Sequence, residues 1–336
     1  MISTRRRLIA LLADGALHSG VQLAADLGVS RAAVWKQVAD IRSLGIDVQS
    51  LDRRGYRLPA RIELIDDERI RAITVAERWP LECELESLFE IDSTNDYLYA
   101  APAPAPGHAR LVFAEWQRAG RGRRGRAWLA PFGSGLTFSI GWTFADMPAD
   151  LSALSLVMGV QVVCGLRRLG ARQASLKWPN DIVVQGRKLG GLLTQLRSEA
   201  GGPAYVVVGL GLNLDLPPAA RAAIDAPGAM PVCDLRDALG GAAPERNRTA
   251  ASVSSAMVEG LARFARDGFA PFAAEWDALD SLHGAAVRIV QGSGAIEGTA
   301  RGVDPDGALR LERDGRIERY VSCDVSLRVA VEDGAR

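Results

Sequence analysis

A segment of seven residues, Gly120–Arg126, holds three glycines and four arginines within an otherwise apolar part of the chain. Glycine lets the backbone approach a ligand closely, and arginine offers planar cations that fit phosphate and carboxylate oxygens. The apolar runs on either side, 111–115 and 136–142, have the composition of strands. The sequence therefore predicts a basic loop held between two strands, which is either a clamp on an anionic ligand or a patch for nucleic acid.

Two familiar nucleotide-binding motifs do not describe this loop. No Gly-Lys-Ser/Thr follows it, as a Walker loop requires. No strand-to-helix turn with an acidic residue downstream frames it, as a Rossmann fingerprint requires. The loop in isolation leaves both interpretations open.

The length of 336 residues exceeds what one hydrophobic core usually holds, so we expect two or three domains. No apolar run approaches the length of a membrane span, and the N-terminal apolar stretch is too short for a secretory signal. The four cysteines show no metal-ligand spacing, and the three histidines form no recognisable pair. We expect a cytoplasmic protein with no membrane contact, reduced thiols and no protein-built metal centre.

Basic residues are concentrated at the N-terminus. Residues 1–62 contain ten arginines and lysines against five aspartates, a net charge of +5, whereas the whole chain has a formal net charge of zero. A small basic domain on a slightly acidic body suggests that this domain faces a polyanion.

The same N-terminal segment has the pattern of a winged helix-turn-helix. Apolar residues at helical spacing predict three helices, with a turn at Gly28 and an N-cap at Ser30 before the third. Residues 48–58 read as a hairpin, the wing. The alternative is a packing module whose basic face is merely solvated and whose tryptophan contacts another domain or a second copy. The residues expected to contact DNA are Ser30, Arg31, Ala32, Trp35, Lys36, Arg53 and Arg54.

Beyond Pro59 the pattern changes to strands with few helices, which favours an α+β domain with a mixed sheet. A long apolar helix is expected over 152–169, and two further helices over 249–267 and 271–282. From residue 285 onward, five short strands separated by Gly and Asp turns are expected.

Three motifs in this region carry cations and amides: KWPND at 177–181, RKLGG at 187–191 and GLGLN at 209–213. Each also has a purely structural interpretation. The first is then a turn after a strand, the second a hairpin tip, and the third a strand packed closely on its neighbour.

Ser93-Thr94-Asn95, Gln117, the glycine–arginine loop and these three motifs occur in the order and approximate spacing of the biotin–protein ligases. The chain resembles that family over essentially its whole length, and most closely the bifunctional ligases that also repress the biotin operon. Lipoate–protein ligases share the catalytic fold, but the arginine-rich loop and KWPND favour biotin. The resemblance implies a winged helix-turn-helix over 1–62, a ligase domain of the biotin/lipoate type over 63–283 and an SH3-like β-barrel over 284–336.

The resemblance also implies a reaction. Biotin's carboxylate attacks the α-phosphate of ATP, with Mg²⁺, to give biotinyl-5′-adenylate and pyrophosphate. The acyl group then passes to a lysine of the biotin carboxyl carrier protein of acetyl-CoA carboxylase. Because the first step brings two anions together, it needs positive charge and positioning more than a general base.

Roles follow residue by residue from the family's motifs. The catalytic group is expected to be Arg121, Arg123, Lys177, Lys188 and Asp181, the last orienting or deprotonating the acceptor lysine. The biotin-binding group is expected to be Ser93, Thr94, Asn95, Gln117, Arg121, Gly122, Arg123 and Lys188. The nucleotide-binding group is expected to be Trp128, Lys177, Asn180 and Asn213.

For regulation, the resemblance implies that bound adenylate orders the loops, promotes a homodimer and so favours palindromic operator DNA. Two alternatives remain. One is a monofunctional ligase whose basic head binds no DNA, and the other is a biotin-sensing repressor without ligase activity. The cations at Arg121, Arg123, Lys177 and Lys188 argue against the second.

Overall fold

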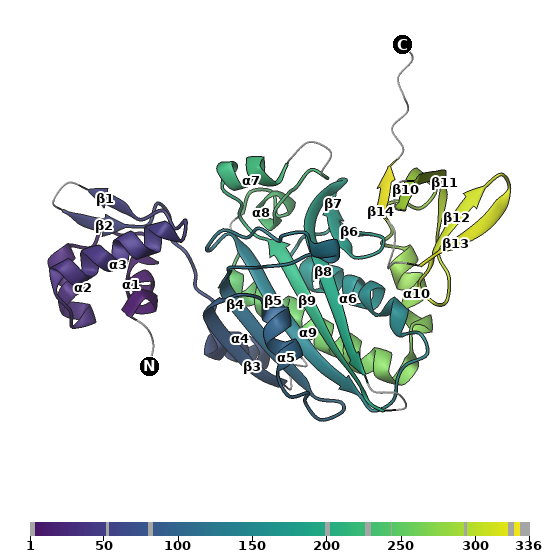
Figure 1. The fold of residues 1–336 in the computed structure, drawn as a ribbon, viewed down its shortest axis with the longest axis horizontal. Coiled ribbons are helices and arrows are strands. Elements are labelled where there is room, and N and C mark those ends of the chain that lie inside the picture. Colours follow the sequence, from purple (N-terminus) through teal and green to yellow (C-terminus); the bar gives the residue numbers. More distant parts are fainter. Residues whose placement is uncertain are drawn as a thin grey trace, which may run out of the picture.

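The structure is a computed structural model, which describes residues 4–51, 54–79, 83–198, 202–225, 230–242, 244–291, 294–321 and 326–329. Three units follow one another along the chain (Figure 1): a small helical unit, a large unit built on a sheet, and a small β unit.

The N-terminal unit is a winged helix-turn-helix, as the sequence predicted. Ser19 and Ser30 cap the second and third helices, accepting from the backbone N–H groups of Gln22 and Ala33. Gly28 ends the second helix at φ 67°, a left-handed conformation that suits glycine. The elements are α1 (Thr4–Leu12), α2 (Gly20–Leu27), α3 (Arg31–Ser43), β1 (Gln49–Leu51) and β2 (Gly55–Arg57).

The central unit is built on a seven-stranded mixed sheet in the order β3-β4-β5-β9-β8-β7-β6. Only the β3–β4 pair is parallel; the other neighbours in this sheet are antiparallel. The strands are β3 (Cys83–Ile91), β4 (Ala109–Gln117), β5 (Gly135–Phe144), β6 (Ala174–Lys177), β7 (Asp181–Val184), β8 (Arg187–Ser198) and β9 (Ala204–Asn213).

The two faces of this sheet have different partners because side chains alternate along a strand. Phe113 of β4 and Val206 of β9 point into the main core with helices α6 (Leu154–Arg168) and α9 (Arg246–Asp267), which lie behind the sheet in Figure 1. Val112 and Val207 point the other way and pack with Leu98 of α5 (Thr94–Ala100). The second face therefore carries a much shorter helix than the first.

The apolar helix expected over 152–169 is α6, preceded by a short 3-10 turn. Among the described residues, the stretch Leu151–Arg168 is the one helical segment long and apolar enough to cross a membrane. It lies 67% buried inside the molecule, which is the position of a core helix.

The helix expected over 271–282 is shorter, and this prediction was wrong at its C-terminal end. Helix α10 (Ala270–Asp277) stops early because the following residues join the edge of the sheet. The N–H of Leu176 donates to the carbonyl of Leu279 and the N–H of Ser281 donates to the carbonyl of Leu176. Helices that the sequence did not predict are α4 (Asp67–Ala76), α7 (Pro218–Ile224) and α8 (Leu235–Ala238).

The C-terminal unit is a five-stranded antiparallel sheet in the order β13-β12-β11-β10-β14. Within the described residues its two outer strands do not pair, so the SH3-like fold is not closed into a ring by hydrogen bonds here. A register shift between Ala300 and Val303 bends the longest strand. The strands are β10 (Ala286–Gln291), β11 (Gly294–Val303), β12 (Leu309–Arg313), β13 (Arg316–Tyr320) and β14 (Ser326–Val329).

A buried arginine joins the start of the central unit to its sheet and its longest helix. Arg246, 4% exposed, donates to the carboxylate of Glu115 at 2.9 Å, to the carbonyl of Gly135 at 3.1 Å and to the carbonyl of Glu63 at 2.5 Å. The carboxylate of Glu115 also accepts from the backbone N–H of Ile65. These bonds hold four separate segments together.

Replacing Arg246 with methionine is expected to lower the free energy of unfolding by about 3–5 kcal/mol, because the Glu115 carboxylate would stay buried without a partner. Chemical denaturation measures this change. The matched control is Arg248→Met on the same helix, whose ion pair with Glu77 is exposed, and which should cost less than about 1 kcal/mol. Equal losses in the two variants would contradict the role assigned to Arg246.

Candidate active site

One cavity of about 860 Å³ opens on the less covered face of the sheet. It is bounded by the glycine–arginine loop, the KWPND and RKLGG segments and the end of β9. Every residue predicted to bind ligand or to take part in catalysis lines this cavity: Ser93, Thr94, Asn95, Gln117, Arg121, Gly122, Arg123, Trp128, Lys177, Asn180, Asp181, Lys188 and Asn213.

The two glycines of GLGLN form the floor of the cavity. Gly209 and Gly211 point to the same face of β9, and a Cβ at either one would overlap a side chain already there. At Gly211 the overlap is with the ring of Trp128, and at Gly209 with the amide of Asn95. The expected close packing is therefore confirmed, and its partners are two of the predicted ligand residues.

The glycine–arginine loop is closed by its own backbone. The N–H of Gly122 donates to the carbonyl of Arg126 at 2.7 Å, and the N–H of Trp128 donates to the carbonyl of Gly120 at 2.8 Å. Arg124 has a left-handed φ of 59°, followed by Gly125 at 69°. This double left-handed turn directs successive arginine side chains to different sides of the loop.

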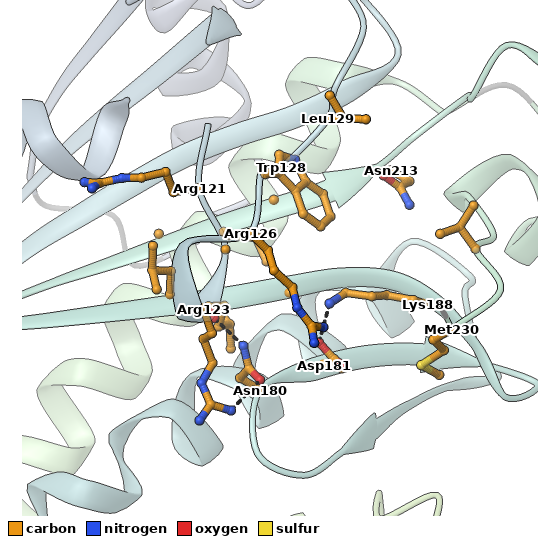
Figure 2. A pocket seen from close by; sticks show the side chains of 18 of the residues that line it. Arg121, Arg123, Arg126, Trp128, Leu129, Asn180, Asp181, Lys188, Asn213 and Met230 are labelled. Carbon is orange, nitrogen blue, oxygen red and sulfur yellow. Dashed lines mark hydrogen bonds and ion pairs between the residues drawn. The ribbon is translucent and has the colours of Figure 1, made fainter. Parts of the chain in front are cut away.

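Figure 2 shows where these arginines point. Arg123 donates to Asn180 Oδ1 at 3.3 Å, and Arg126 extends toward Asp181. Arg121 extends the other way, to an ion pair with Asp96 at the start of α5. The structure therefore does not bring the Arg121 guanidinium to the other cations, whereas it does bring Arg126, which the sequence interpretation omitted. The sequence alone could not show in which direction each arginine side chain points, because all of these arginines lie in one short segment.

A lysine–carboxylate pair occupies the far wall of the cavity. Lys188 Nζ donates to Asp181 Oδ1 at 2.5 Å and lies 6.0 Å from the centre of the Trp128 ring. Both come from the β7–β8 hairpin, and a Cβ at Gly191 would lie 3.3 Å from Lys188 Nζ. Lys177 lies near Met230, with 3.5 Å between Nζ and Sδ.

The two asparagines predicted to contact nucleotide also hold the cavity wall. Asn180 Nδ2 donates to the carbonyl of Leu192 at 2.6 Å, which ties the KWPND turn to β8. Asn213 is buried, and its Nδ2 donates to the carbonyl of Cys233 at 3.0 Å. Their side-chain N–H groups thus already bond the protein backbone.

The opposite end of the cavity is neutral and hydrogen-bonded. Ser93 caps α5 by accepting from the N–H of Asp96 at 3.3 Å, and the N–H of Thr94 donates to Gln117 Oε1 at 2.8 Å. Asn95 Nδ2 donates to Gln195 Oε1 at 3.0 Å. Ser139 bonds both Thr94 and Asn95. The sequence interpretation missed Ser139 and Gln195, which lie in strands without a recognisable motif.

Three cysteines of the described chain are free thiols. Burial raises the pKa of Cys83 to about 12 and that of Cys233 to about 11, so both stay protonated and are poor nucleophiles. Cys323 lies outside the described residues. Among those residues, no group of three or more His, Cys, Asp or Glu side chains could hold a metal ion.

Six of the seven predicted DNA-contacting residues lie within the described residues, and all six belong to the N-terminal unit. Arg54 is exposed next to the wing strand β2, while Arg53 lies outside the described residues. Trp35 is 64% exposed, which is unusual for a side chain of this size. The exposed residues of the α3 N-terminus and its cap are Ser30, Arg31, Ala32, Trp35 and Lys36.

Replacing Gly211 with alanine is expected to displace Trp128 and loosen the loop above it. We expect a loss of about 1–3 kcal/mol in the free energy of unfolding and faster tryptic cleavage after the loop arginines. Limited proteolysis with mass spectrometry reads out the cleavage. Gly20→Ala is the control, because its Cβ would lie 3.6 Å from the nearest atom. Unchanged loop cleavage in the Gly211 variant would argue against the packing described.

Comparison with known proteins finds three family profiles in order along the chain. The profile of the HTH domain matches residues 4–57, that of the biotin/lipoate A/B protein ligase family matches residues 89–213, and that of the biotin protein ligase C terminal domain matches residues 282–328. The biotin protein ligase from Aquifex aeolicus, solved in complex with biotin and ATP, has a TM-score of 0.61 and 27% identity. That likeness covers 74% of this chain and 99% of the solved one.

Two relatives match almost end to end. The bifunctional ligase/repressor BirA of Salmonella typhimurium is 38% identical over 328 residues, covering 96% of this chain and 97% of the relative. That of Escherichia coli is 37% identical over 324 residues, with the same coverage. With all three profiles in order and this identity over nearly its whole length, the chain belongs to the bifunctional biotin ligase/repressor family.

Proposed function

We propose that the chain is an ATP-dependent biotin–protein ligase and a biotin-responsive repressor. The observation that best supports the ligase activity is the cavity itself. It has a neutral hydrogen-bonding end and a cationic end, and the glycine–arginine loop forms part of its wall. DNA binding, ligation and support of the ligase site are proposed to divide over residues 1–62, 63–283 and 284–336.

Biotin, which has a neutral ring at one end and a carboxylate at the other, fits a cavity with a neutral end and a cationic end. Its ureido ring is neutral and offers donors and an acceptor, which suit Thr94 and Gln117 at the neutral end. Ser93, Asn95 and the backbone at Gly122 belong to the same end. Its valeryl chain would then carry the carboxylate toward Lys188 and Arg123.

The cationic end suits the first step. A carboxylate attacks the α-phosphate, its oxygen forms the new P–O bond, and pyrophosphate leaves, so negative charge gathers at one place. Lys188 and Arg123 lower the repulsion between the carboxylate and the phosphates, because their positive charges stabilise the negative charge that gathers there. Lys177 adds charge, and Trp128 and the two asparagines are proposed to hold the adenosine. Asp181 orients Lys188 through their 2.5 Å bond.

Arg121 has a different place in this proposal. Its side chain bonds Asp96, so its contribution to binding is through its backbone and through the start of α5. Arg126, which lines the cavity and extends toward Asp181 (Figure 2), is added as a second guanidinium beside that of Arg123.

Magnesium fits this cavity only as a partner of the nucleotide. Asp181 is the one carboxylate among the lining residues, and it already accepts from Lys188. Mg²⁺ usually binds one or two carboxylates together with substrate phosphates, so ATP would bring most of its ligands. When bound, it would neutralise phosphate charge.

In the second step the acceptor is proposed to be the lysine of the biotin carboxyl carrier protein of acetyl-CoA carboxylase. Its amine attacks the mixed anhydride carbonyl, and AMP leaves. The amine must first lose a proton, and Asp181 is the carboxylate available to orient or accept it. Closure of the arginine loop over the bound adenylate would exclude water and so protect the anhydride.

The repressor activity is proposed to use the exposed face of α3 and the wing on operator DNA. Adenylate binding would promote a homodimer, whose twofold symmetry matches a palindromic operator. Both partners, the operator and the carrier, would be met in the cytoplasm.

The deciding experiment incubates the protein with ATP, Mg²⁺, biotin and a carrier domain and measures the carrier's mass. One added biotin is the expected result, and an unchanged mass with a folded enzyme would reject the ligase. Ultracentrifugation and operator binding with and without biotin and ATP test the repressor separately, and an active ligase without DNA binding would identify a monofunctional enzyme.

Lys188→Gln is expected to slow adenylate formation by about 100-fold, because it removes the cation nearest the reacting phosphate. Pyrophosphate release from biotin and ATP measures the rate. Arg187→Gln is the control, since the neighbouring Arg187 pairs with Asp237 at 3.2 Å and does not line the cavity. A similar loss in both variants would mean that Lys188 acts only through general stability or charge.

Lys36→Ala is expected to weaken DNA binding at every sequence and to reduce the slope of log affinity against log salt by about 1, as for one lost phosphate contact. Fluorescence anisotropy over a salt series measures this. Biotinylation should not change. Arg266→Ala removes an exposed cation from α9, outside the N-terminal unit, and should leave the slope as it was. An unaltered slope in the Lys36 variant would place DNA on another surface.

A further inference from the structure

Behind the neutral end of the cavity lies a buried hydrogen-bonded chain that direct ligand contacts do not explain. Ser139 of β5 is 0% exposed and does not line the cavity. Its Oγ lies 2.6 Å from Asn95 Oδ1 and 2.7 Å from Thr94 Oγ1, so it touches two residues that do line it. Because a hydroxyl has one proton, the group to which it donates in the core determines whether it donates or accepts at the cavity wall.

A backbone carbonyl determines the direction at one end of this chain. Asn95 Nδ2 is 3.1 Å from the carbonyl oxygen of Leu193, which can only accept. The amide of Asn95 must therefore present its oxygen to Ser139. Ser139 has one proton and donates it to that oxygen, so toward Thr94 it can only accept.

A backbone N–H determines the direction at the other end. The N–H of Thr94 donates to Gln117 Oε1 at 2.8 Å, which turns the oxygen of Gln117 toward the protein and leaves Gln117 Nε2 as the group to meet a ligand. Thr94 Oγ1 lies 2.7 Å from Ser139 Oγ and 3.2 Å from Gln117 Oε1, and both of these atoms accept. The one hydroxyl proton of Thr94 is therefore used inside the protein.

We infer that Ser139 is a specificity-determining residue, because it makes Thr94 an obligatory acceptor toward the ligand. The wall then offers a lone pair at Thr94 beside N–H donors at Gln117. The complementary ligand edge is an N–H next to a carbonyl oxygen, as in a cyclic urea. If a ring oxygen replaced that N–H, its lone pair would face the lone pair of the Thr94 hydroxyl, and the two would repel each other. This inference rests on the proposed function and names the residue that makes its biotin site selective.

The test compares biotin with two cyclic-carbamate analogues, in each of which oxygen replaces one ring N–H. The measured quantity is the ratio of kcat/KM for adenylation of biotin to that of each analogue. The full-length protein should reject one analogue by about 100-fold or more, since its site is built to pair with that N–H.

In Ser139→Ala the closest acceptor for the Thr94 hydroxyl is gone. The remaining acceptor inside the protein, Gln117 Oε1, lies 3.2 Å away, so the proton is freer to turn toward the ligand. We expect the ratio to fall about tenfold or more, because the penalty for the unpaired acceptor is then relieved. Ser139→Cys carries a weak donor and acceptor of similar size and should give an intermediate ratio. If the alanine variant does not fold, the ratio measured for the cysteine variant tests the inference.

Thr137→Val is the matched control. It removes a buried hydroxyl from the same face of the same strand, one that donates to the carbonyl of Ala114 at 3.1 Å instead of to the cavity wall. It should keep the wild-type ratio. A wild-type ratio in folded Ser139 variants would overturn the inference, whereas no adenylation of biotin by the wild-type protein would overturn the proposed function.

Discussion

The site depends on the absence of side chains at two positions of the central strand β9. Gly209 and Gly211 leave the space that Asn95 and Trp128 fill, and a methyl group at either position would overlap those side chains. Asn95 comes from the start of α5 and Trp128 from the end of the arginine loop. The two glycines thus allow separate segments to meet over one strand, and the cavity is the space that remains between them.

The two ends of the resulting cavity differ in charge. At one end, hydroxyl and amide groups are held by backbone groups and offer fixed donors and acceptors. At the other end, Lys188 pairs with the carboxylate of Asp181, Arg123 bonds Asn180, and Arg126 extends toward Asp181. A molecule with a neutral polar head and an anionic tail fits this gradient, and binding in that orientation brings its carboxylate to the cations that the reaction needs.

The units outside the ligase sheet are tied to the same elements. Arg5 of α1 pairs with Glu90 of β3, and Phe132, just past the arginine loop, packs at 5.8 Å from Phe89 of β3. From the C-terminal unit, the carbonyl of Gly307 accepts from Trp178 Nε1 at 3.1 Å, within KWPND. Strand β3, which packs against the segment after the arginine loop, thus contacts the N-terminal unit, and the KWPND turn contacts the C-terminal unit.

Local pattern was enough to determine much of this protein from its sequence: the capped helices of the head, the strands, and the set of motifs that meet in one cavity. Local pattern failed where the contacting residues are far apart in the sequence, as at the end of α10, where residues 279 and 281 form hydrogen bonds with β6. Only the tertiary structure decided that Arg121 pairs with Asp96, that Arg126 extends toward Asp181 and that Ser139 controls the wall. The reason is that the direction of a side chain or a proton depends on partners 25 to 98 positions away, which no local pattern records.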